Sequence, residues 1–195
     1  MSPRGVAIPD LRERLFAAAE RVVVRDGAAA LTSRAITAEA ACSKGVLHTH
    51  FAGLDEFVAE LLLDRFARSA RQAEALQAKV GQAGVADNLQ EVVLALLDSL
   101  PPALVGLAMT RPAAALHTRE GFRSGAPAFD AIQHAFTVYL QAEQREGRLP
   151  AGADAETIAL ALVGTTHHLL MTRSPGQGED AKVTTARLLS VLLGC

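Results

Sequence analysis

Hydrophobic and polar residues alternate along this chain with the spacing of α-helices rather than that of β-strands. Leu11, Leu15 and Ala18 recur at intervals of three or four residues with Arg and Glu between them, which predicts a helix over residues 9–26 with one apolar face. The same spacing continues to the C-terminus, broken by stretches that contain Gly or Pro, and no segment alternates over the length of a strand. The pattern predicts an all-α protein of about nine helices.

Breaks in the apolar pattern divide the rest of the chain into further helices. Thr32 precedes a short periodic stretch at 33–41, and Ser43 is expected to cap another at 44–51, because a serine hydroxyl accepts a hydrogen bond from an amide of the first helical turn. The later helices are expected over residues 55–80, 86–100, 102–117, 127–146, 154–172 and 180–193. The organisation predicted is a three-helix head at residues 1–53 on a larger helical domain at 54–195.

Composition agrees with a helical fold and limits the choice of partners. Half of the 195 residues are apolar, and only seven Phe and one Tyr are aromatic, which favours packed helices over a β-sandwich. The formal net charge is −2, but residues 1–53 hold seven Lys or Arg against five acids. A weakly basic head on an acidic body permits contact with nucleic acid without requiring it.

Several classes of protein are disfavoured. The N-terminal segment carries charges where a signal peptide needs an apolar run, and the longest uncharged apolar stretch, Ile158 to Met171, is too short to span a bilayer. Two cysteines do not form a disulfide framework, so we expect a soluble, cytoplasmic protein with no membrane contact. Because the sequence signatures of hydrolases, nucleotide-binding loops and zinc enzymes do not occur, no catalytic residue, metal or cofactor is predicted.

Residues 32–51 combine features that suit the major groove of DNA. Two short helices around a tight turn, the second with a cationic first turn, are the layout of a helix-turn-helix. The major groove admits one helix, whose first side chains meet base edges. Gly45 would allow close approach, Val46 offers methyl groups to a thymine, and Lys44 can reach a guanine or a phosphate. Leu47 and Phe51, four residues apart, are expected to face the core of the head.

The stretch LTSRAITAEAACSKGVLHTHFAGLDEFVAELL resembles the amino-terminal domain of the TetR family of transcriptional regulators. The residues that carry the resemblance are Thr32, Arg34, Ile36, Glu39, Ala40, Ser43, Lys44, Gly45, Leu47 and Phe51. The motif spans roughly residues 10–62, while the rest of the chain agrees with the family in length and in its all-helical pattern.

The resemblance implies a repressor that leaves a palindromic double-stranded DNA operator when a small-molecule effector binds. Its DNA face would consist of Thr32, Arg34, Ser43, Lys44, Gly45, Val46, His48, Thr49 and His50. The Ala, Leu and Val content of the second domain favours a mainly apolar effector. The candidates for the ligand-binding pocket are Met109, His117, Phe122, Phe129, His134, Tyr139 and His168.

The resemblance also implies a homodimer that pairs through the last two helices. The stretch 154–172 has apolar residues on almost every side, and a helix that is apolar all round must be buried all round. Two heads would then face successive major grooves, about 34 Å apart. The alternative is a monomer whose own core these helices complete.

Four positions depart from the family pattern. Ala41 replaces the glycine of the turn, at a cost on the order of 1 kcal/mol if its φ is positive. Leu54 replaces a lysine that meets phosphate, and His48 and His50 replace two tyrosines. Residues two apart on a helix point about 200° away from each other, so these histidines are expected to contact phosphate rather than to chelate a metal, with burial of His50 as the alternative. An alternative function is a ligand-binding module whose head no longer reads DNA.

Overall fold

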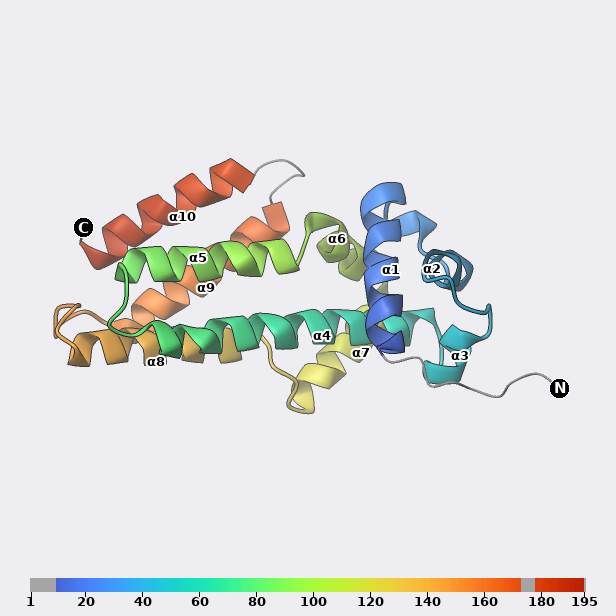
Figure 1. The fold of residues 1–195 in the computed structure, drawn as a ribbon, viewed down its shortest axis with the longest axis horizontal. Helices are drawn as coiled ribbons and strands as arrows, with labels where there is room; N and C mark the ends of the chain where they lie inside the picture. The colour runs from blue at the N-terminus through green and yellow to red at the C-terminus, as the bar shows by residue number, and fades with distance from the viewer. Residues whose placement is uncertain (1–9, 173–177, 195) are drawn as a thin grey trace.

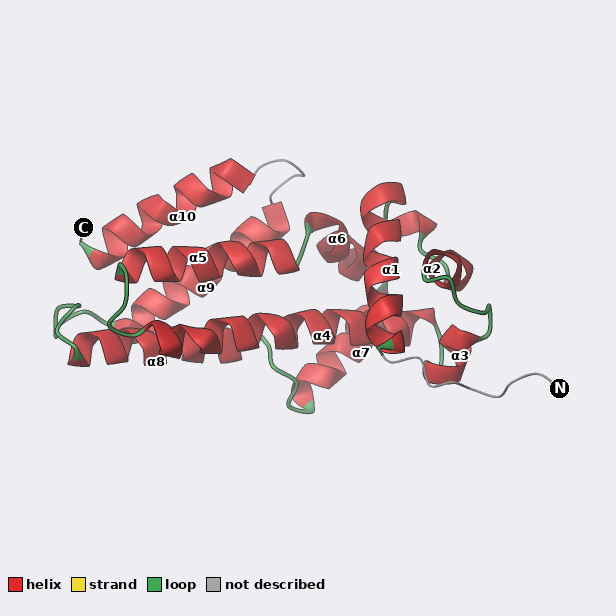
Figure 2. Ribbon diagram, in the orientation of Figure 1, coloured by secondary structure: helices red, strands yellow, loops and turns green. Residues whose placement is uncertain are grey.

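The computed structural model describes residues 10–172 and 178–194, with the side chains of four of these (Val105, Ala108, Met109 and Gly178) left out. Within these ranges the chain forms ten α-helices and two short 3₁₀ helices, without a strand (Figures 1 and 2). The predicted all-α fold is therefore confirmed, with a helix count close to the nine expected.

The helices follow one another with short connections (Figure 1). Their bounds are α1 Leu11–Asp26, α2 Ser33–Glu39, α3 Val46–His50, α4 Leu54–Glu74, α5 Val85–Ser99, α6 Pro102–Thr110, α7 Pro112–Arg123, α8 Phe129–Arg145, α9 Ala155–Thr172 and α10 Gly178–Leu193. The 3₁₀ helices are Ala28–Ala30, between α1 and α2, and Ala75–Lys79, which prolongs α4. Helices α1–α3 gather at one end of the molecule, and α4 runs from them to the opposite end.

Two of the predicted helix boundaries are wrong. The stretch 102–117 is not one helix, because Arg111 has φ −124° and ψ 87°, outside the helical region, as a residue before proline often is. Pro112 then starts α7 at a position where its missing N–H is not needed. Ser43 does not cap α3: the helix begins at Val46, whose amide bonds the carbonyl of Ser43 at 3.1 Å, and Gly45 is the N-cap residue.

The core of the head is closed by side chains from beyond residue 53. Phe16 and Phe51 meet Phe57 of α4, with ring centroids 5.4 and 4.9 Å from that of Phe57. The other buried members from later helices are Val58, Leu61 and Leu62 of α4, Leu104 and Leu107 of α6, and Ala114 of α7. Leu47 and Phe51 are both buried, so the prediction that they face this core is confirmed.

A second apolar core joins the C-terminal half of α4 with α5, α8, α9 and α10. Tyr139 of α8 is fully buried there, and its hydroxyl accepts a hydrogen bond from the Asn88 amide at 3.0 Å. Burial disfavours the phenolate and raises the pKa of Tyr139 to about 12. Among the helices described, none has the length and apolar character that crossing a membrane requires.

Candidate DNA-binding face and ligand pocket

The first helix of the helix-turn-helix is fixed at its start by Thr32. The Thr32 hydroxyl oxygen accepts a hydrogen bond from the Ala35 amide at 3.1 Å, which satisfies one of the amides that a helix start leaves unpaired. Ile36 is fully buried and turns one face of α2 into the head. Thr32 and Arg34 remain exposed, so both are accessible to a partner outside the chain.

The turn after α2 has the hydrogen bonds of a Schellman motif. The Ala41 amide bonds the Ala38 carbonyl at 3.1 Å, and the Cys42 amide bonds the Thr37 carbonyl at 2.9 Å. Ala41 therefore occupies the left-handed position of that motif, with φ 51°, where glycine is usual. Arg14 of α1 donates to the Ala40 carbonyl at 2.9 Å and holds this end of α2 against the head.

The second helix of the motif is short and presents polar groups to solvent. Leu47 holds α3 against the core, while Lys44, Gly45, His48, Thr49 and His50 are exposed and Val46 is half-buried. The exposure of His50 makes its alternative placement inside the head wrong. A Cβ on Gly45 would meet no atom within 4 Å, and the φ of Gly45 is −84°. The fold itself does not require glycine at this position.

The cations of the head differ in whether an acid neutralises them. Arg21 and Arg25 both bond Glu39, at 2.7 and 2.9 Å, and these hydrogen bonds lower the pKa of the Glu39 carboxyl. By contrast, Arg34 and Lys44 are exposed and form no ion pair with any residue between 10 and 172 or between 178 and 194. Two positive charges without an acidic partner thus lie on α2 and in the turn before α3.

A small apolar pocket of about 270 Å³ lies among α4, α7, α8, α9 and the end of α5. It is lined by Leu62, Phe66, Leu100, Ala115, Thr118, Arg119, Phe122, Phe129, Leu170 and Met171. The ring centroid of Phe66 lies 5.1 Å from that of Phe122 and 5.1 Å from that of Phe129, and both pairs are nearly perpendicular. Of these lining side chains, Arg119 alone carries a charge.

The structure brings two of the seven predicted pocket residues, Phe122 and Phe129, to this pocket. His117, His134 and His168 are exposed and lie outside it, and Tyr139 belongs to the second core. The side chain of Met109 lies outside the described residues. The sequence reasoning missed Phe66 and Arg119; the four-residue spacing of Leu62 and Phe66 on α4 is the signal that could have found Phe66.

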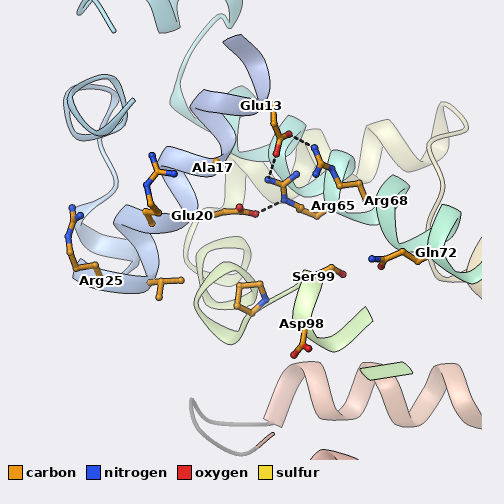
Figure 3. Close-up of a pocket in the computed structure, with 12 residues that line it drawn as sticks. Glu13, Ala17, Glu20, Arg25, Arg65, Arg68, Gln72, Asp98 and Ser99 are labelled. Atoms are coloured by element: carbon orange, nitrogen blue, oxygen red, sulfur yellow. Dashed lines mark hydrogen bonds and ion pairs between the residues drawn. The ribbon is translucent and has the colours of Figure 1, made fainter. Parts of the chain in front are cut away.

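A charged cleft of about 750 Å³ lies between α1, α4 and the C-terminal end of α5 with the following Pro101 (Figure 3). At its base, Arg65 of α4 is only 5% exposed and forms ion pairs with Glu13 and Glu20 of α1. Arg68 also bonds Glu13 (Figure 3). Because a buried charge that loses its partners is strongly destabilising, these ion pairs fasten α1 to the middle of α4.

A second polar connection joins the pocket helix α7 to the head. Arg111, immediately before α7, donates to the Asp55 carboxylate at 2.8 Å and to the Leu31 carbonyl at 3.2 Å. Leu31 directly precedes Thr32, the N-cap of α2. A shift of α7 would therefore act on the backbone at the start of the helix-turn-helix.

The last two helices expose apolar side chains on the single chain. Leu160 and Met171 of α9 are 58% and 45% exposed, and Val183 and Val191 of α10 are 41% and 81% exposed. The single chain therefore does not bury α9 on all sides, and its burial by a second subunit stays a prediction.

Comparisons with known proteins agree with this geometry. Residues 15–61 match the family model described as bacterial regulatory proteins, tetR family. A search of curated proteins returned no match. Among solved structures, Salmonella enterica GusR is 20% identical, with 100% of each chain covered and a TM-score of 0.66. A candidate TetR-family regulator from Mesorhizobium loti MAFF303099 is 15% identical over 94% of this chain and 95% of that one, also with a TM-score of 0.66.

A third similar structure contains a ligand. FadR from Bacillus subtilis, in complex with stearoyl-CoA, is 14% identical over 93% of this chain and 97% of that one, with a TM-score of 0.60. These structural likenesses establish the fold, and the family match covers the exposed helix-turn-helix, the DNA-binding part of bacterial regulatory proteins of this type. Residues 15–61 match the TetR family in sequence, which confirms the resemblance seen there, and the chain as a whole has the fold of the TetR-family structures it matches.

Proposed function

We propose that the protein is a homodimeric repressor that binds a roughly palindromic DNA operator and leaves it when a small, mainly apolar effector enters the pocket. The observation that carries this proposal is the pairing of charges in the head. Glu39 and Asp26 form ion pairs with Arg21 and Arg25, whereas Arg34 on α2 and Lys44 in the turn before α3 keep exposed, unpaired charges. Unpaired cations around a short exposed helix suit the phosphates that flank a major groove.

The polar residues of the α3 segment complete this interface. Lys44 reaches a phosphate or a guanine edge, and Gly45 leaves room for the duplex where the fold has no need of glycine. The exposed imidazoles of His48 and His50 donate hydrogen bonds to phosphate oxygens. Thr32 uses its hydroxyl oxygen to accept from Ala35, so its hydroxyl hydrogen can be donated to the DNA backbone.

Dimerisation through α9 and α10 is supported by their exposed apolar side chains. Leu160, Met171, Val183 and Val191 face solvent in one chain, and a second copy would remove them from water. Burial of apolar area contributes roughly 25 cal/mol per Å² before the losses of association entropy are subtracted. A two-fold pair is also the arrangement that a palindromic site requires.

The route from effector to DNA runs along α7. Thr118, Arg119 and Phe122 of this helix line the pocket, and Arg111 at its N-terminal end bonds Asp55 and the Leu31 carbonyl. An effector that moves α7 would displace the start of α2. The protein exchanges between a conformation that binds DNA and one that does not. The effector shifts this equilibrium only if its affinity for the second conformation is higher than its affinity for the first.

The experiment that tests this function is selection of bound duplexes from random DNA, followed by affinity measurements at several salt concentrations. Lys44→Gln should weaken binding to the selected site and reduce the salt slope by about one released counterion. Lys79→Gln is the matched control. Lys79 is the last residue of the 3₁₀ helix that prolongs α4 away from the head, and it pairs with Glu91. If both variants bind as the wild type does, Lys44 is not part of the interface.

A second candidate function is a ligand-binding module whose head does not read DNA. Leu54, half-buried at the start of α4, is the observation in its favour, because it leaves that helix start without a cation for phosphate. The same titration separates the two candidates. A protein that retains no duplex from the random pool at low ionic strength supports the second one.

A further inference from the structure

We propose that the effector is a small aromatic carboxylate, held by Arg119 at its charged end and by Phe66, Phe122 and Phe129 around its ring. This inference rests on the proposed function, because it takes the 270 Å³ pocket as the effector site. The proposed function specifies only a mainly apolar effector. The single charge and the aromatic rings of the pocket narrow the effector to one chemical class.

The charge comes from Arg119 of α7. Its side chain lines the pocket, no carboxylate does, and Arg119 forms no ion pair with any side chain in the described ranges. Arg123, one turn later on the same helix, lies instead outside the pocket and within 3.7 Å of Glu120. A guanidinium left unpaired beside an apolar pocket suits an anion, because its planar fork donates two parallel hydrogen bonds to one carboxylate.

The other polar group of the pocket is already engaged. The Thr118 hydroxyl donates to the Ala114 carbonyl at 2.8 Å, so its hydrogen is not available to a ligand. Arg119 is therefore the side-chain donor, among the described lining residues, that is free to fix the orientation of a bound molecule. A ligand with an acceptor at one end and an apolar remainder matches this distribution.

The aromatic part follows from the three phenylalanines. Phe66 is nearly perpendicular to both Phe122 and Phe129, with interplanar angles of 88° and 83°. Aromatic rings favour such edge-to-face contacts, and a ligand ring can continue the same pattern. Leu62, Leu170 and Met171 cover the remaining wall with aliphatic groups.

The volume limits the size of the ligand. About 270 Å³ lies just below the range of roughly 300–1,000 Å³ that encloses drug-sized molecules. One ring with a short acidic side chain fits this space, whereas a long-chain acyl-CoA does not. Phenylacetate is a probe of the expected class, and phenylacetamide has nearly the same shape without the charge.

Calorimetric titration of the full-length protein near neutral pH tests the inference. The wild type should bind phenylacetate about tenfold more tightly than phenylacetamide, because the amide has no negative charge and only one acceptor oxygen for the guanidinium. In Arg119→Gln the affinity for phenylacetate should fall to that for phenylacetamide, because the variant lacks the guanidinium that binds the carboxylate. The control Arg123→Gln should keep the wild-type preference. Phe122→Leu, which keeps an apolar side chain of similar size, should weaken both ligands by about threefold.

Three results would overturn the inference. Equal affinities for the two probes in the wild type, or a preference that survives Arg119→Gln, would remove the role of the charge. An unchanged affinity in Phe122→Leu would remove the role of the ring. Failure of both probes to bind at millimolar concentration would reject the ligand class. Operator binding of the unliganded protein is measured separately, so the proposed DNA-binding function would stand or fall by itself.

Discussion

Replacing Ala41 by glycine should stabilise the turn between the two helices of the DNA-binding motif. Ala41 has φ 51° at the left-handed position of the Schellman motif, and both hydrogen bonds of that motif use backbone atoms that glycine also has. The Ala41 side chain is exposed, so its removal sacrifices little apolar burial. The substitution therefore changes mainly the backbone energy of one residue.

The magnitude is a difference between two opposing effects. An L-residue in the left-handed region costs roughly 1–2 kcal/mol, and glycine avoids this strain. Glycine loses more backbone entropy than alanine on folding, which costs roughly 0.5–1 kcal/mol. We expect the free energy of unfolding of Ala41→Gly to exceed that of the wild type by about 0.5–1 kcal/mol.

The assay is urea unfolding followed by circular dichroism, at one fixed protein concentration because subunit association changes apparent stability. Ala38→Gly is the matched control. Ala38 is also exposed but lies within α2, where glycine should destabilise by about 1 kcal/mol. If Ala41→Gly lowered the stability as Ala38→Gly does, the left-handed geometry assigned to the turn would be refuted.

Three further substitutions test other parts of the molecule. Arg111→Gln should leave effector affinity within about twofold but weaken effector-induced release of a fluorescent operator by about 1 kcal/mol of coupling energy; unchanged coupling would contradict the α7 route. Leu160→Glu should shift the protein from dimer to monomer in sedimentation experiments, since it places a charge on the exposed face of α9; an unchanged mass would place the dimer interface elsewhere. Tyr139 has a pKa of about 12 in the fold against 10.0 for the free side chain, so its contribution to stability is complete below pH 10 and is lost as the pH rises towards 12. The free energy of unfolding of Tyr139→Phe should therefore fall less steeply than that of the wild type between pH 10 and 12. Identical pH profiles of the two proteins would contradict the raised pKa of Tyr139.

The long helices could be predicted because their periodicity is sustained. The prediction over residues 9–26 agrees with α1 to within two residues at its N-terminal end, and the prediction at 154–172 agrees equally well with α9. The break at Arg111 was missed although Pro112 is visible in the sequence. Proline is also favoured at the first position of a helix, and apolar residues continue on both sides of it.

The head and the pocket differed in how far sequence could predict them. The buried positions Leu47 and Phe51 follow from local spacing, since they lie four apart on a short helix. The pocket is formed by four helices and the end of a fifth, so which residues line it depends on how those helices pack. His117 and Arg119 are only two residues apart on α7, yet only Arg119 lines the pocket. Their residue types do not reveal which of the two faces the neighbouring helices.

The dual role of α4 has a consequence for how such regulators can exchange parts during evolution. Phe57, Val58, Leu61 and Leu62 complete the core of the reading head, while Ala70 of the same helix belongs to the other core. A gene segment that carried only residues 1–53 into a new regulator would arrive without these side chains. A recombination point that preserves a working head therefore falls within a continuous helix. The receiving protein must also provide apolar side chains in place of the α6 leucines that pack against the core of the head. New operator specificity is reached more easily by point substitution on α3 than by swapping heads.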